Sequence, residues 1–178
     1  LGLDLKGGLH FVLGIDFAEV HRETITKMKH QVQDLAEREK LEGFTLEATK
    51  DNRLMVRTTT DLSWTKLDDL IGKNLHQYIT LDKKTGNEGI FSMTQLYVAQ
   101  VNRQALEQSR ETLTNRIDEF GIAEPDIKIQ GEEKIMVEFP GLQEPGRLKE
   151  IISRTAKLAF QIVRTGEGQS SGTITVEQ

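Results

Sequence analysis

The sequence of 178 residues has no cysteine, three prolines and one tryptophan. Without cysteine the chain forms no disulfide, no thiolate metal site and no cysteine nucleophile. It also lacks any apolar run near the roughly 20 residues that a membrane-spanning helix needs. With 37% hydrophobic residues, it is long enough to bury a core of one domain or two small ones.

Charge and histidine spacing exclude further classes. The formal net charge of -5 argues against a general surface for nucleic acid or anionic lipid. The four histidines show no spacing typical of metal ligands, and no serine, lysine or histidine is fixed beside a carboxylate by spacing. We therefore expect no enzyme, no cofactor and no metal site. The four are His10, His21, His30 and His76.

The most informative segment runs from Leu113 to Gly141. Gly121 follows a long helical pattern, and glycine is free to take the positive φ that closes a last helical turn. Glu124 precedes Pro125, which favours extended geometry and prevents the helix from resuming. Apolar residues then alternate with polar ones over 126–131 and 134–139, which predicts a hairpin that ends at Pro140-Gly141.

Similar patterns place the other elements. In the first part of the chain we predict a strand at 9–16, a helix at 18–41 stopped by Gly43, and strands at 44–48 and 54–58. A helix from Asp61 to Leu70, capped by Asp61, should follow, and then strands at 77–81 and 90–93 around a polar loop at 83–89. Beyond these we predict a helix at 95–120 capped by Thr94, a helix at 146–154 and a strand at 156–163.

This order predicts an α+β protein. Strand 9–16 and the elements from 95 to 163 spell β-α-β-β-α-β, a ferredoxin-like antiparallel sheet with helices on one face. Residues 17–94 read α-β-β-α-β-β, which we interpret as an inserted subdomain; a degenerate repeat that competes for the first strand is the alternative. In the first case strand 9–16 pairs with strands 126–139 and 156–163.

Two polar features allow a functional and a structural interpretation. Gly2-Leu3-Asp4-Leu5-Lys6-Gly7-Gly8 precedes a strand, whereas a phosphate-binding loop lies between a strand and a helix, so we favour a backbone bend. Arg116 lies at the edge of the apolar stripe of helix 95–120. We expect it to be buried and bonded to Glu124 or to carbonyl groups near Gly121, because an unpaired arginine there is costly.

Together these motifs resemble the SecD family, the proton-driven accessory subunits of the bacterial Sec protein-export machinery. The likeness is to the first periplasmic domain, strong over 1–16 and about 98–163 and weak between. The positions that match the family pattern, with structural or hinge roles, are Gly2, Leu3, Asp4, Gly7, Gly8, Asn115, Arg116, Gly121, Glu124, Pro125, Gln130, Gly131, Pro140 and Gly141.

The resemblance implies a non-enzymatic base and hinge at the periplasmic face of the bacterial inner membrane. The partners it implies are SecF, the SecYEG channel and unfolded preprotein, the last mainly through a mobile head inserted after the last base strand. The chain opens on Leu1 without a targeting segment. We thus expect a soluble piece of a multi-pass membrane protein, with 164–178 as linker and start of the head.

The alternative from another class is an independent ferredoxin-like module that binds RNA or a small ligand. RNA-recognition domains display aromatic side chains on the open face of their sheet. Here Phe139 shares a face with Ile135 and Val137, the expected packed side, and the chain is acidic. A hydrolase or transferase has no support beyond abundant carboxylates.

The last segment predicts its own behaviour. Residues 165–172 are rich in glycine and serine, whereas Ile174 and Val176 alternate with polar residues. We expect 165–178 to be poorly packed, disordered or held by a non-native neighbour, with these two residues in a strand whose native partners lie in the head.

Overall fold

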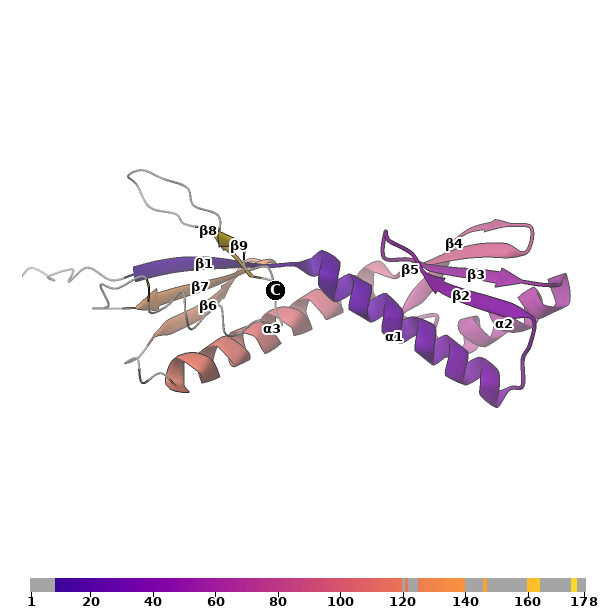
Figure 1. Ribbon diagram of the computed structural model, residues 1–178, viewed down its shortest axis with the longest axis horizontal. Helices are drawn as coiled ribbons and strands as arrows, with labels where there is room; N and C mark the ends of the chain where they lie inside the picture. Colours follow the sequence, from indigo (N-terminus) through magenta and orange to yellow (C-terminus); the bar gives the residue numbers. More distant parts are fainter. Residues whose placement is uncertain are drawn as a thin grey trace, which may run out of the picture. The chain divides into compact units, whose positions relative to one another are not determined.

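The computed structural model describes residues 9–119, 121, 125–139, 146, 160–163 and 174–175. The chain forms two compact units. Unit 1 holds the chain up to Asp16 and from Asn102 onward, and unit 2 runs from Phe17 to Val101. The passage back to unit 1 falls inside the long helix α3 (Gln95–Glu119), whose first turns belong to unit 2 (Figure 1).

Unit 1 is built on an antiparallel sheet with strand order β6-β7-β1-β8-β9. The strands are β1 (Leu9–Ile15), β6 (Asp126–Gln130), β7 (Lys134–Phe139), β8 (Phe160–Val163) and β9 (Ile174–Thr175). In the register, Leu13 stands opposite Ile135 of β7 on one side and Ile162 of β8 on the other. The predicted pairing of the first strand with strands more than a hundred residues later is therefore confirmed.

The strand directions agree with the predicted β-α-β-β-α-β unit. Since β1 and β6 are each antiparallel to β7, they run parallel to each other with β7 between them. A helix joining two parallel strands that are separated by a third is the split β-α-β arrangement of a ferredoxin-like sheet. The α+β class is confirmed: three helices accompany two antiparallel sheets in the described residues.

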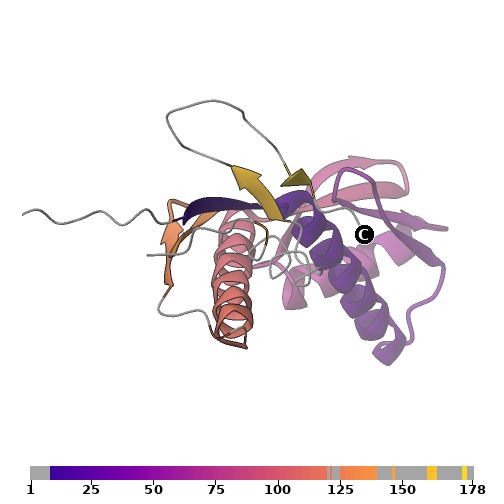
Figure 2. The ribbon, with the colours of Figure 1, turned by 60° about the vertical axis from the view of Figure 1, so that its left-hand side comes forward.

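One face of the unit 1 sheet carries α3 (Figure 2). Helical spacing predicts an apolar stripe on this helix, and four of its members, Val101, Ala105, Leu113 and Ile117, are buried. Val98 is half-buried and Phe120 lies outside the described residues. The members are Val98, Val101, Ala105, Leu113, Ile117 and Phe120. Two further helix residues, Leu106 and Ser109, are also buried, and the Ser109 hydroxyl donates to the Ala105 carbonyl oxygen at 2.6 Å. Because the hydroxyl group has this hydrogen-bond partner, burial of Ser109 leaves no unpaired donor in the core. The strands supply Leu13, Ile135, Val137 and Phe139.

Unit 2 is a four-stranded antiparallel sheet of order β2-β3-β5-β4 with two helices. Its elements are α1 (Phe17–Arg38), β2 (Phe44–Ala48), β3 (Leu54–Thr58), α2 (Asp61–Asn74), β4 (Ile79–Thr85) and β5 (Glu88–Met93). Both helices contact β3, and α1 also contacts β2. The core between helices and sheet comprises Met28, Val32, Ala36, Leu54, Val56, Trp64, Leu67, Leu70, Ile71, Leu75, Ile79 and Phe91.

The end of α1 corrects the sequence prediction. The helix stops at Arg38, before the predicted Leu41, and Lys40 rather than Gly43 takes the left-handed conformation that ends it, with φ of 53°. The Leu41 amide donates to the Ala36 carbonyl at 2.8 Å, and the Lys40 amide to the Glu37 carbonyl at 3.0 Å. This bond pair is a Schellman motif, in which a non-glycine residue here fills the usual glycine position.

Two further boundaries differ. Thr60 rather than Asp61 caps α2, and its hydroxyl accepts the Ser63 amide at 3.1 Å. The hairpin of β4 and β5 turns over Gly86 and Asn87, so most of the predicted polar loop is strand. Thr94 accepts the Tyr97 amide at the start of α3, which confirms its predicted role as the cap.

The C-terminal predictions are tested only in part. Helix 146–154 lies outside the described residues except for Gly146, which is helical. Ile174 and Thr175 form β9, antiparallel to β8, so the partner of Ile174 lies in unit 1 and not in a head. The prediction of an unpartnered strand was wrong there because the alternating pattern marks a strand but not its neighbour. The other residues of 165–178 lie outside the described part.

A close contact in unit 2 predicts the effect of a single methyl group. A Cβ added at Gly89 on β5 would lie 2.0 Å from the Cη2 atom of Trp64, which is buried and stacked on Phe91. Gly89→Ala should therefore lower the free energy of unfolding by about 1–3 kcal/mol in urea titrations. Gly72→Ala is the matched control: nothing lies within 4 Å, so it should raise stability by about 0.5–1 kcal/mol. Equal effects of both substitutions would contradict this packing.

Candidate functional site

The candidate site lies on the face of the unit 1 sheet opposite α3. Successive side chains of a strand point to opposite faces. Leu13 on β1 and Ile135 on β7 are buried on the side of α3, so their neighbours along each strand point to the opposite face. In the register, His10 stands opposite Glu138 and Val12 opposite Met136. These pairs, with Gln130 at the end of β6 and Lys134 at the start of β7, form an open face of mixed polarity.

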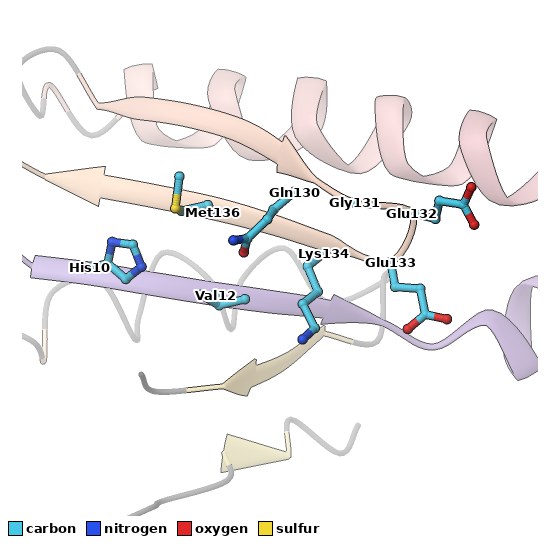
Figure 3. Close-up of a pocket in the computed structure, with 8 residues that line it drawn as sticks. All are labelled: His10, Val12, Gln130, Gly131, Glu132, Glu133, Lys134 and Met136. Carbon is cyan, nitrogen blue, oxygen red and sulfur yellow. The ribbon is translucent and has the colours of Figure 1, made fainter. Parts of the chain in front are cut away.

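A groove of about 620 Å³ runs over this face. It is lined by His10, Val12, Gln130, Gly131, Glu132, Glu133, Lys134 and Met136. Figure 3 shows its residues on β1, on β7 and on the turn between β6 and β7, with α3 behind the strands. The apolar side chains Val12 and Met136 stand beside the polar Gln130 and Lys134. The lining is therefore mixed, with two apolar side chains among charged and polar residues.

Two pairs of charged groups lie around the groove. His10 Nδ1 lies 3.2 Å from Glu138 Oε1. The Lys128 amine on β6 bonds to the Asp126 carboxylate; this hydrogen bond first, then the charge of Asp126 and more weakly that of Glu138, raises the Lys128 pKa. In the part of the chain that the structure describes, no three metal-ligating side chains converge.

The family-motif residues spread over this unit. Gln130 and Gly131 line the groove, and Gly131 takes the positive φ of 64° that the hairpin turn needs. Gly121 has φ of 65°, which confirms its predicted role at the end of α3. Pro125 immediately precedes β6, and Asn115 is exposed on α3. The others, Gly2, Leu3, Asp4, Gly7, Gly8, Glu124, Pro140 and Gly141, lie outside the described residues.

Arg116 corrects a prediction. Its side chain is 45% exposed and its guanidinium contacts Glu119 at 3.1 Å, one helical turn onward. The expected burial was wrong because the stripe that enters the core runs through Leu113 and Ile117. A residue next to Ile117 is turned by about 100° around the helix, which places Arg116 at the water. The predicted partner Glu124 lies outside the described residues.

Sequence reasoning missed the groove itself. The alternation along the strands places His10, Val12, Lys134 and Met136 on the face opposite the predicted core, but it assigns them no binding role. The available signal was the irregularity of that face, where Val12 and Met136 interrupt the polar alternation. Only the register, which brings these two residues opposite each other, turns that irregularity into one apolar patch.

Comparisons with known proteins agree with the motifs. The family described as protein translocase subunit SecDF, P1 domain, N-terminal, matches residues 106–165. A protein translocase subunit SecD from Syntrophobacter fumaroxidans is 32% identical over 170 residues, which is 93% of this chain and 32% of the relative. Those of Pseudomonas aeruginosa and Escherichia coli K12 are each 29% identical, over 99% and 96% of the chain and 29% and 28% of the relatives.

The chain thus spans about a third of the length of these curated relatives. Their shared name describes subunits of a transport machine, in agreement with the expectation of a non-enzymatic protein. No helix among the described residues is both long and apolar enough to cross a membrane.

The position of Arg116 predicts a small effect of its removal. Arg116→Ala should change the free energy of unfolding by less than about 0.5 kcal/mol, because an exposed pair between neighbouring helical turns contributes little. The neighbouring Ile117, 1% exposed, is the matched contrast, and Ile117→Ala should cost about 2–4 kcal/mol. Urea unfolding followed by circular dichroism measures both. A loss above about 1 kcal/mol for Arg116→Ala would restore a structural role for the guanidinium.

Proposed function

The chain belongs to the SecD family, and we propose that it is the base and hinge of a periplasmic domain which captures preprotein during export through the Sec channel. The energy for that export would come from the proton-motive force across the inner membrane. In the full-length protein the base would work with SecF and SecYEG. The ferredoxin-like part, 1–16 and 95–163, would be the base, 17–94 an insertion, and 164–178 the start of the mobile head.

The observation that carries this proposal is the position of β1. This strand is paired on both sides, to β7 and to β8, although at least 118 residues lie between it and either strand. A strand near the start of the chain is thereby fixed in the middle of a sheet made from its end, which suits a rigid stand. The strand β8 leads from that same sheet into 164–178, where Ile174 and Thr175 pair back with it, so movement of a head would begin beyond Thr175.

The alternative, an RNA-binding module, has no observation in its favour. In β1, β6 and β7 the aromatic residues are Phe11 and Phe139, whose rings contact each other edge to face at 6.3 Å, and Phe139 is buried. The opposite face of these three strands carries His10, Val12 and Met136 instead, of which Val12 is buried. Stacking of bases needs exposed rings.

If the head captures the preprotein, a longer chain that includes the head should bind preprotein more tightly. A chain that continues beyond residue 178 through the region the relatives carry next should bind an unfolded, reduced precursor at least about tenfold more tightly than residues 1–178. A larger apolar surface for the extended substrate would cause the gain. Fluorescence titration with the same labelled precursor compares the two chains. Equal affinity would move the main capture site onto the base.

A rigid base predicts insensitivity to cross-linking. The Ile15 amide donates to the Glu133 carbonyl at 3.4 Å, so His10 and Glu138 form one of the alternate, more closely spaced pairs of the ladder. The double substitution His10→Cys, Glu138→Cys should form a disulfide, and the chain has no other cysteine to compete.

In the longer chain, oxidation of this pair should leave precursor affinity unchanged, since β1 and β7 would not separate during capture. The single variant His10→Cys under the same oxidant is the control. A loss of affinity that dithiothreitol reverses would show that the base moves or that the open face takes part.

A further inference from the structure

The four edges of the two sheets are not equally protected. Unpaired edge strands attract other strands, and proteins block them with lysine, proline, bulges or short length. Edge β6 follows Pro125 and carries Lys128, and β9 has two residues. Edge β4 has a register irregularity between Leu81 and Lys83. The fourth edge, β2, has no lysine, proline or register irregularity over its five residues, and Glu47 is its one charged residue.

The outward backbone groups of β2 follow from the ladder. The Thr58 amide on β3 donates to the Asn87 carbonyl on the β5 side at 2.9 Å, so alternate β3 residues point away from β2. Their partners in the register must point outward as well. These are Phe44, Leu46 and Ala48, which stand opposite Thr58, Val56 and Leu54. No other described residue bonds to their backbone groups.

Apolar side chains adjoin this open edge. Phe44 and Leu46 are half-buried and pack against the core of unit 2, together with Leu35 and Leu41 from the end of α1 and its turn. The exposed parts of these four side chains adjoin the unpaired backbone groups of β2. A strand added to β2 would bury alternate side chains against this apolar surface. Strand addition of this kind gains affinity from backbone hydrogen bonds and specificity from side-chain contacts.

The charge around the edge selects the occupant. Before β2 three carboxylates, Glu37, Glu39 and Glu42, outnumber two cations, Arg38 and Lys40, whereas Lys50, Asp51 and Arg53 follow its other end. Arg57 is shared by Glu47 at 3.2 Å and Glu88 at 2.6 Å, so this ladder also keeps a net negative charge. The carboxyl end of α1 adds its partial negative charge at the start of β2.

We propose that the outer edge of β2 binds a short extended polypeptide, apolar at alternate positions and carrying lysine or arginine, as a fifth strand of the unit 2 sheet. The site lies outside residues 106–165, where the family match falls. It would be a second, weaker contact beside the head. That the polypeptide is an exported preprotein rests on the proposed function; the recognition of basic extended peptide does not.

The test uses the 178-residue chain and a fluorescein-labelled peptide, Lys-Thr-Val-Lys-Val-Thr-Val-Lys. Ala48→Pro removes an outward amide, whereas the ladder between β2 and β3 uses Thr45 and Glu47. Anisotropy titration should show roughly three- to tenfold weaker binding, the value of one lost hydrogen bond. Leu81→Pro, which removes an outward amide on the protected edge β4, should leave binding unchanged.

Two further measurements separate the contributions. Glu42→Lys should weaken binding about two- to threefold at low salt, and the difference should vanish at high salt. In the unaltered chain, saturating peptide should slow hydrogen exchange at the amides of Phe44, Leu46 and Ala48 and leave that of β6 unchanged. This readout stands even where Ala48→Pro proves poorly folded in thermal melting.

Unchanged exchange at β2, or equal weakening by Ala48→Pro and Leu81→Pro, would overturn the proposal. Concentration-dependent dimers in sedimentation that Ala48→Pro abolishes, without peptide binding, would instead identify a second copy as the occupant and also overturn it. None of these results alters the comparison of short and long chains with precursor. Failure of the edge and failure of the proposed function are therefore distinguishable.

Discussion

The rest of unit 1 depends on the pairing of β1 with two strands from the far end of the chain. Leu13 is fully buried between Ile135 and Ile162 in the register, and it faces the side on which α3 lies. A one-residue slip of β1 would turn Leu13 to the open face and bring His10 under the helix, so the register is strongly specified. Closing a sheet over such a sequence distance costs conformational entropy, which the buried contacts must offset.

The same pairing creates the candidate site. Because β1 and β7 are in register through their buried residues, their other faces bring Val12 and Met136 together and set His10 against Glu138. The groove is thus a by-product of how the core is packed. Since the buried face of the sheet holds the fold, residues on the groove face can change without loss of the fold.

The strands that could be predicted from the sequence are those with one buried and one exposed face. Strands β2, β3 and β7 alternate cleanly, and their predicted bounds match the structure. By contrast β4 is almost wholly exposed beyond Ile79, so Lys83 and Lys84 gave no alternation and read as a loop. Lys40 ended α1 where a glycine was expected, since the Schellman bonds and not the residue type decide. Arg116 was predicted to be buried, although it lies one residue, or about 100° around α3, from the buried Ile117. The apolar residues of this helix are spaced irregularly, so the sequence pattern does not define the edge of the buried stripe to within one residue.

The two sheets also differ in what they expose. In unit 1 the open face carries the polar groups and the groove, and its described edges are blocked or short. In unit 2 the charged ladder of Glu47, Arg57 and Glu88 occupies the face away from the core, and the edge of β2 keeps unpaired backbone groups beside apolar side chains. An edge of that kind invites aggregation unless it is used or covered. The acidic residues that precede β2 favour a basic chain over a second copy of this acidic protein, so the same carboxylates that attract an extended cationic segment also disfavour self-association.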